Sequence, residues 1–80
     1  MDVAERFLHG VDSTLRQLSR TPKIGALIHP RREELTGLRR WPVEGFESIL
    51  LFYIPQSESI ELVRVLHGKR NWERLFRKRN

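Results

Sequence analysis

The sequence predicts an α+β fold in which one long N-terminal helix packs on a three-stranded antiparallel meander, followed by a short basic C-terminal helix. One observation behind this prediction is a stripe of apolar residues at helical spacing near the N-terminus. The other is a set of three strand-like runs in the second half of the chain. A chain of 80 residues, 39% of them hydrophobic, can build one small core, so we expect a single domain over residues 1–80.

The first element is a helix expected from about Asp2 to Arg20. Asp2 is a suitable N-cap, and Glu5 follows it at the spacing of a capping box. Thr21-Pro22 ends the helix because proline disfavours helical geometry in the residue before it. Gly10 costs about 1 kcal/mol relative to alanine inside a helix, which indicates that another backbone approaches closely there. The apolar stripe comprises Val3, Ala4, Phe7, Leu8, Val11, Leu15 and Leu18.

Three strands are expected after an irregular surface loop at residues 26–36, namely Leu38 to Val43, Ser48 to Ile54 and Ser59 to His67. The middle strand contains the unbroken apolar run Ile49 to Ile54, which implies burial on both faces and a central place in the sheet. The short turns between the strands predict an antiparallel meander. Strict alternation along the third strand would give one face to Ile60, Leu62, Arg64 and Leu66.

The last element is a short helix after Gly68, predicted by Trp72, Leu75 and Phe76 at offsets of three and four. Its opposite face would carry Arg70, Arg74, Arg77 and Lys78. The final fourteen residues contain six basic residues and one acidic residue, a net charge of +5. The positive electrostatic field of this segment favours an acidic partner or a phosphate backbone over a neutral small molecule. A solvated basic C-terminal end explains the charge equally well.

Several classes of function lack the residues that they need. The chain has no cysteine, which excludes disulfides and thiolate metal sites and makes the cytoplasm the expected location. The longest apolar run is far shorter than the roughly 20 residues of a transmembrane helix, and the first residues lack the basic start of a signal peptide. His9, His29 and His67 lack metal-ligand spacing, and no phosphate-binding glycine motif occurs, so we expect neither a metal nor a cofactor.

A basic cluster is expected where the third strand ends. It comprises His67, Lys69 and Arg70, which Arg39, Arg40 and Arg64 could reach from the sheet. Such a set could bind phosphates, and His67 could transfer a proton in RNA cleavage, where the 2′-hydroxyl is the nucleophile. Taken singly, a strand-end histidine is more often a hydrogen-bonding surface group, and Arg64 could simply extend its stem over apolar surface.

Three segments resemble the RelE/ParE toxin family of bacterial type II toxin–antitoxin systems: residues 37–46, residues 51–53 and residues 63–70. The first helix, with Arg6-Phe7-Leu8, and the loop after it are also similar, so the resemblance covers almost the whole chain. Members of this family usually begin with a further strand and helix, to which nothing here corresponds. The resemblance therefore implies an N-terminally shortened domain with an exposed sheet edge and an exposed helix face, which a partner could fill.

The resemblance implies a toxin that is neutralised by a cognate antitoxin in the cytoplasm. The RNA-cleaving branch of the family typically has a basic residue before the central strand, whereas Ser48-Ile49-Leu50 is uncharged, and Gly68-Lys69-Arg70 departs from the tail of one nuclease subgroup. This favours the ParE-like branch, whose members bind DNA gyrase and need no catalytic residue. The expected target-binding or phosphate-binding residues are Arg39, Arg40, His67, Lys69, Arg70 and Arg74.

Two alternatives stay open at this point. One is a RelE-like ribosome-dependent mRNA endoribonuclease, with the ribosome and mRNA as partners, in which Arg64, His67 and Arg70 surround the scissile phosphate. The other is an inactive toxin remnant or a basic interaction module without toxicity. The endoribonuclease requires its three side chains to converge on one phosphate, whereas binding of a target does not.

Overall fold

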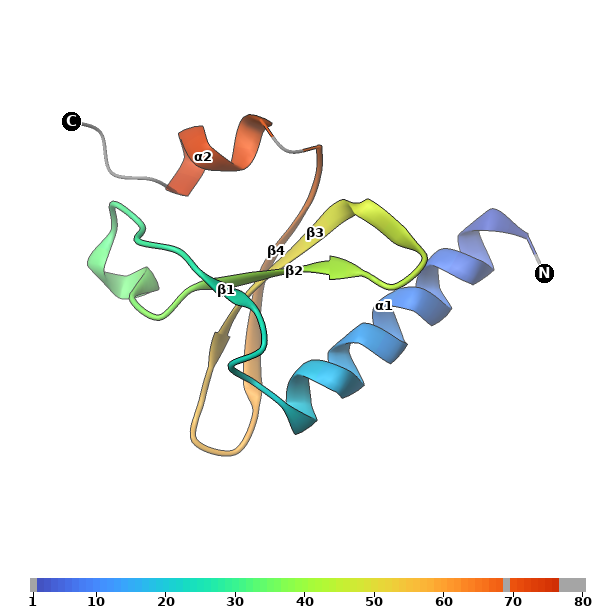
Figure 1. The fold of residues 1–80 in the computed structure, drawn as a ribbon, viewed down its shortest axis with the longest axis horizontal. Helices are drawn as coiled ribbons and strands as arrows, with labels where there is room; N and C mark the ends of the chain where they lie inside the picture. The colour runs from blue at the N-terminus through green and yellow to red at the C-terminus, as the bar shows by residue number, and fades with distance from the viewer. Residues whose placement is uncertain (1, 69, 77–80) are drawn as a thin grey trace.

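The computed structural model describes residues 2–68 and 70–76, and Figure 1 shows its ribbon. The elements in chain order are α1 (Val3–Arg20), β1 (Ala26–Leu27), a 3₁₀ helix (Glu33–Leu35), β2 (Arg39–Val43), β3 (Phe46–Pro55), β4 (Ile60–His67) and α2 (Arg70–Phe76). The strands form one antiparallel sheet in the order β1-β2-β3-β4. The predicted α+β arrangement of a long helix, a meander and a short C-terminal helix is confirmed.

Helix α1 begins at the predicted N-cap. The Asp2 carboxylate accepts a hydrogen bond from the Glu5 backbone N–H at 2.8 Å, and the Glu5 carboxylate accepts one from the Asp2 N–H at 3.3 Å. Both bonds of the capping box are therefore present, and they satisfy donors that a helix start otherwise leaves unpaired. The helix ends at Arg20, in front of Thr21-Pro22, as predicted.

The buried face of α1 differs in part from the predicted stripe. Four members of the stripe pack against the sheet: Phe7, Val11, Leu15 and Leu18. Ala4 is instead exposed, and Val3 and Leu8 are 61% and 65% exposed. Gly10 and Thr14 are buried in addition. The buried face is rotated relative to the predicted stripe because Gly10 and Thr14 contact the turn between β2 and β3. Hydrophobic periodicity does not reveal this contact.

Among the described residues the sheet has four strands where three were predicted, because part of the expected surface loop forms β1. Ala26 pairs with Arg40 and Leu27 pairs with Arg39 of β2. Both β1 side chains are exposed, and two residues are too few to produce a detectable alternation. The correction therefore adds a very short edge strand and leaves the order of the three predicted strands unchanged.

Strand β3 is buried on both faces, as the apolar run Ile49 to Ile54 predicts. Leu51 and Tyr53 pack with α1 on one face, while Leu50 and Phe52 pack with α2 on the other. All four side chains are buried. The two helices lie on opposite sides of the sheet in Figure 1, so we name the two sides of the sheet the α1 face and the α2 face.

A bulge interrupts the alternation of β4. The register between β3 and β4 shifts between Phe52 and Tyr53, so Val63 of β4 is an additional residue. Val63 therefore joins Arg64 on the α2 face, and Leu62 lies on the α1 face. The prediction that Leu62 and Arg64 share a face is wrong, because strict alternation fails at a bulge.

Candidate functional site

The α2 face carries a row of three side chains across the sheet. Phe52 of β3 pairs with Arg40 of β2 on one side and with Arg64 of β4 on the other. Directly paired residues of an antiparallel sheet project from the same face, so both arginines lie beside Phe52 on the α2 face. Two strand spacings, about 10 Å, separate their backbones. The structure thus brings Arg40 and Arg64 to one surface.

Helix α2 covers part of this row. The Arg40 guanidinium carbon lies 5.0 Å from the centroid of the Trp72 ring, which is the geometry of a cation–π contact. The rings of Trp72 and Phe76 have their centroids 5.9 Å and 4.9 Å from that of Phe52. Arg40 is half-buried as a result, whereas Arg64 remains exposed.

The C-terminal end of α2 is attached to the loop before β2. The Arg31 backbone N–H donates to the Phe76 carbonyl oxygen at 2.6 Å, and the Arg31 guanidinium donates to the Arg74 carbonyl oxygen at 3.2 Å. These bonds satisfy carbonyl groups at the end of a helix, where a positive charge is favourable. The Arg74 side chain is exposed, and so it is accessible to a partner.

Arg39 has a different environment from Arg40, because neighbouring residues of a strand project from opposite faces. Its guanidinium donates to the carbonyl oxygens of Lys23 and Gly25, at 3.1 Å and 2.7 Å. Arg39 therefore anchors the loop that follows α1. This structural role was not predicted from the sequence, which assigned Arg39 to target binding, and it reduces the number of donors that Arg39 can offer to a partner.

Tyr53 anchors the same loop. Its hydroxyl donates to the Pro22 carbonyl oxygen at 2.7 Å and accepts a bond from the Gly25 N–H at 3.0 Å. Burial raises the pKa of Tyr53, an effect that the Gly25 hydrogen bond and the charge of Arg39 oppose. The hydroxyl therefore stays protonated near neutral pH, as its bond to Pro22 requires.

His67 lies on the opposite face of the sheet from Arg64. Its Cα partner is Ile49, whose side chain packs on the α1 face, and the His67 side chain is exposed. Lys69 and the side chain of Arg70 lie outside the described residues. The predicted basic cluster is therefore divided: Arg40 and Arg64 share one surface, and His67 lies on the other.

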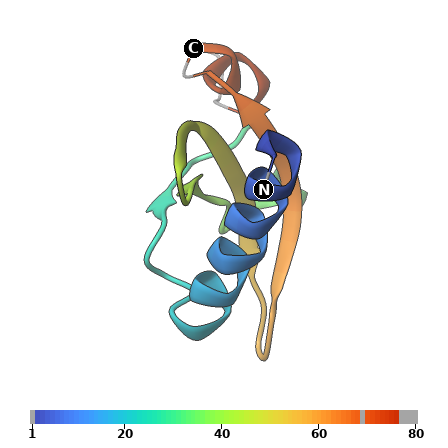
Figure 2. The ribbon, with the colours of Figure 1, turned by 90° about the vertical axis from the view of Figure 1, so that its right-hand side faces the viewer.

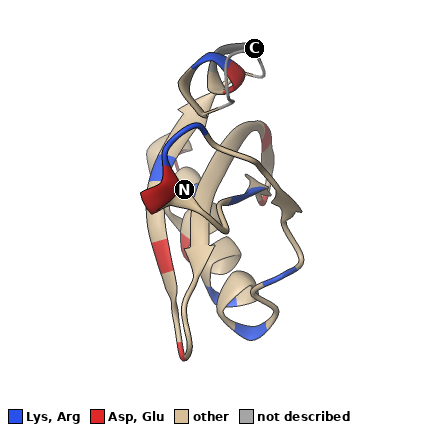
Figure 3. Ribbon diagram, turned by 90° about the vertical axis from the view of Figure 1, so that its left-hand side faces the viewer, with Lys and Arg blue, Asp and Glu red and all other residues tan. Residues whose placement is uncertain are grey.

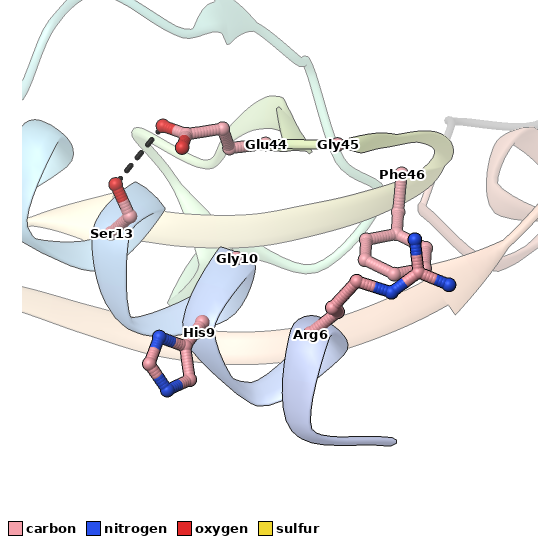
Figure 4. Close-up of a pocket in the computed structure, with 7 residues that line it drawn as sticks. All are labelled: Arg6, His9, Gly10, Ser13, Glu44, Gly45 and Phe46. Atoms are coloured by element: carbon pink, nitrogen blue, oxygen red, sulfur yellow. Dashed lines mark hydrogen bonds between the residues drawn. The ribbon is translucent and has the colours of Figure 1, made fainter. Parts of the chain in front are cut away.

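A cleft of about 560 Å³ lies between α1 and the turn that joins β2 and β3 (Figure 4). It is lined by Arg6, His9, Gly10, Ser13, Glu44, Gly45 and Phe46. The Ser13 hydroxyl donates to the Glu44 carboxylate at 3.0 Å across the cleft. A Cβ on Gly10 would lie 2.5 Å from the Glu44 carbonyl oxygen, which confirms the predicted close approach of two backbones. The remaining cleft residues were not predicted.

Few of the described basic residues form an ion pair with a carboxylate. The ion pairs between described residues are Arg16–Asp12 and Arg32–Glu34. Within the described part of the chain, Arg40, Arg64 and Arg74 thus have no carboxylate partner. Basic residues occur in the helices, the loops and the strands (Figure 3).

The described residues contain no group of three or more side chains suited to hold a metal ion. No helix among them is long and apolar enough to cross a membrane.

Comparison with known families agrees with this architecture. The family model of the ParE toxin of type II toxin–antitoxin systems, parDE, matches residues 1–72. The match spans α1, the whole sheet and the first residues of α2. No curated protein and no solved structure matches the chain. Membership of such a system implies an antitoxin as partner. The chain therefore belongs to the ParE toxin family of type II toxin–antitoxin systems.

Proposed function

We propose that this toxin acts by binding DNA gyrase and that a cognate antitoxin neutralises it by direct contact. The observation that carries the proposal is the match to the ParE toxin family over residues 1–72. The uncharged segment Ser48-Ile49-Leu50, where the RNA-cleaving branch typically has a basic residue, supports the same branch.

The separation of Arg64 and His67 favours binding over RNA cleavage. A general acid or base acts within about 2.6–3.2 Å of the atom that it protonates or deprotonates, and a cation that stabilises the phosphate must act at the same place. Arg64 projects from the α2 face and His67 from the α1 face, so the sheet lies between them. This arrangement is unfavourable for RNA cleavage in which Arg64 and His67 act together at one scissile phosphate.

The α2 side of the molecule offers a contact surface for an acidic protein target. Arg40, Arg64 and Arg74 lie on this face or on the helix that covers it, without carboxylate partners among the described residues. Arginine beside aromatic rings is enriched at protein interfaces, and positive charge favours a surface of opposite sign. We expect gyrase to contact this surface.

Two parallel reactions test the proposed mechanism. One follows supercoiling of relaxed plasmid by purified gyrase, and the other is an in vitro translation reaction in which the mRNA is examined for cleavage. We expect the toxin to inhibit supercoiling and to leave the mRNA intact, with His67→Ala indistinguishable from the wild type in both. Cleavage of mRNA that is lost in His67→Ala would overturn the proposal in favour of the endoribonuclease. Inactivity in both reactions would point to a non-toxic remnant.

A further inference from the structure

The cleft between α1 and the turn that joins β2 and β3 lies outside the proposed contact with gyrase, which uses the α2 side. Its volume of about 560 Å³ is within the range of small-molecule sites, about 300–1,000 Å³. Arg6, His9 and Ser13 line it from α1, where residues at offsets of three and four share one face. Glu44 and Phe46 line it from the turn and from the start of β3. In Figure 2, α1 packs in front of the sheet to which this turn belongs.

Two opposite charges line the cleft without pairing with each other. Arg6 and Glu44 are both exposed, and the ion pairs between described residues involve neither of them. The Glu44 carboxylate instead accepts a hydrogen bond from the Ser13 hydroxyl at 3.0 Å. Ser13 follows Arg6 by seven residues, which is about 10 Å along a helix, so the two charges lie at different turns of α1. In Figure 4 the Arg6 side chain extends in the direction of Phe46, and Glu44 extends towards Ser13.

Phe46 adds an apolar wall beside the two charges. Its ring is half-buried and packs edge to face with the Phe7 ring, with 5.3 Å between the ring centroids. This contact restrains the Phe46 ring, and the bond from Ser13 restrains the Glu44 side chain. Both groups are therefore positioned before a ligand binds, which lowers the entropic cost of binding.

The charges select the class of ligand. A simple anion such as phosphate would be attracted by Arg6 and repelled by Glu44, and a simple cation would meet the reverse. An amino-acid zwitterion is repelled by neither residue, because it carries a carboxylate and an ammonium group in one small molecule. An apolar side chain on this ligand would also remove the surface of Phe46 from water.

We propose that the cleft binds a zwitterionic amino acid with an aromatic or large apolar side chain. Its carboxylate contacts Arg6, its ammonium group contacts Glu44, and its side chain packs on Phe46. His9 points away from Phe46 in Figure 4 and has no part in these contacts. A free amino acid and a short peptide with free termini share this chemistry. The site does not rest on the proposed function, because none of its residues belongs to the surface proposed for gyrase.

The test titrates the isotope-labelled full chain with L-phenylalanine and with analogues that each lack one group. The analogue 3-phenylpropionate lacks the ammonium group, phenethylamine lacks the carboxylate, and glycine lacks the side chain. We expect phenylalanine to shift the backbone amide signals of residues 6–13 and 44–46, with a dissociation constant on the order of a millimolar. Each analogue should bind about 3–10-fold more weakly, as expected for contacts in a partly open site. Tighter binding of the dipeptide Ala-Phe would identify a short peptide as the ligand, and weaker binding a free amino acid.

Two variants assign the contacts. Glu44→Gln keeps an acceptor for Ser13 but removes the charge, so it should abolish the preference for phenylalanine over 3-phenylpropionate and keep the preference over phenethylamine. Arg6→Gln should do the reverse. Glu47→Gln and Arg20→Gln, at exposed residues outside the cleft, are the matched controls and should keep both preferences. The site is refuted if phenylalanine shifts no amide signal of the cleft, if 3-phenylpropionate or phenethylamine binds the wild type as tightly as phenylalanine does, or if Glu44→Gln behaves like Glu47→Gln.

Discussion

Tyr53 shows how one polar atom can determine the path of a loop. Its hydroxyl bonds to the Pro22 carbonyl and to the Gly25 N–H, and the replacement Tyr53→Phe removes both bonds while keeping the ring. We expect the free energy of unfolding, measured by urea denaturation, to fall by about 1–3 kcal/mol. Ser19→Ala removes an exposed bond to the Leu15 carbonyl and is the control, with an expected change below about 0.5 kcal/mol. Equal losses in both variants would refute this role of Tyr53.

The raised pKa of the Tyr53 hydroxyl predicts that the protein loses stability at alkaline pH. Burial raises the pKa of Tyr53 above its ordinary value of about 10. Below about pH 10 the folded and the unfolded chain both keep the phenolic proton of Tyr53, and the hydroxyl makes its full contribution to the free energy of unfolding. Above it the unfolded chain releases the proton while the folded chain retains it, so the free energy of unfolding falls as the pH rises towards the folded pKa. Urea midpoints should therefore decline more steeply above about pH 10 for the wild type than for Tyr53→Phe. Parallel declines would contradict the raised pKa.

The sequence predicts which residues are buried more reliably than it predicts the residues that they contact. Burial of the run Ile49 to Ile54, which includes Tyr53, and close backbone approach at Gly10 are both confirmed. The bonds from Arg39 to Lys23 and Gly25 were not predictable, because they depend on where the loop after α1 returns to the sheet. Local periodicity carries no information about such distant contacts.

At the scale of elements, α1 and the turn between β2 and β3 are joined by two hydroxyl groups. The buried Thr14 hydroxyl accepts from the Glu44 N–H at 2.9 Å and donates to the Gly10 carbonyl oxygen at 2.6 Å, whereas Ser13 bonds the exposed Glu44 carboxylate. Thr14→Val keeps the shape, leaves the part-buried Glu44 N–H without this acceptor and removes the buried bond to the Gly10 carbonyl, so we expect a loss of about 1–3 kcal/mol in urea denaturation. Ser13→Ala is the matched control, with an expected loss below about 1 kcal/mol. A larger effect at Ser13 would contradict this assignment.

Gly10→Ala tests the same contact through the backbone. In an exposed helix this change gains about 1 kcal/mol, but here the added Cβ would lie 2.5 Å from the Glu44 carbonyl oxygen. Overpacking costs about 1–3 kcal/mol, so we expect a net loss of stability or, at the least, no gain. Thermal unfolding measures the difference. A stabilised Gly10→Ala variant would show that α1 and the turn are not in close contact.

Element type was predictable where local chemistry is strong. The capping box of α1 and the doubly buried run of β3 are local signals, and both elements are confirmed. Strand β1 and the bulge at Val63 depend on pairing with neighbours, and neither has a local signal. The same holds for the candidate site. Arg40 and Arg64 were selected from the sequence because of their charge, whereas their common face follows from the strand register, in which both pair with Phe52.

At the scale of the whole molecule, one sheet separates two surfaces with different chemistry. The α2 face carries Arg40 and Arg64 beside aromatic rings, and the α1 face of β4 carries the exposed side chains of Leu62 and Val65. The first surface is the one at which we propose that an acidic protein target binds.

Direct binding of the purified full chain to gyrase is the most informative measurement. We expect a complex whose dissociation constant rises about tenfold or more in the double variant Arg64→Glu/Arg74→Glu, because both exposed charges then oppose an acidic target. The double variant Arg16→Glu/Arg20→Glu on α1 should stay within about twofold of the wild type. Absence of any complex with gyrase, together with cleavage of translated mRNA, would contradict the proposal that this toxin acts by binding gyrase.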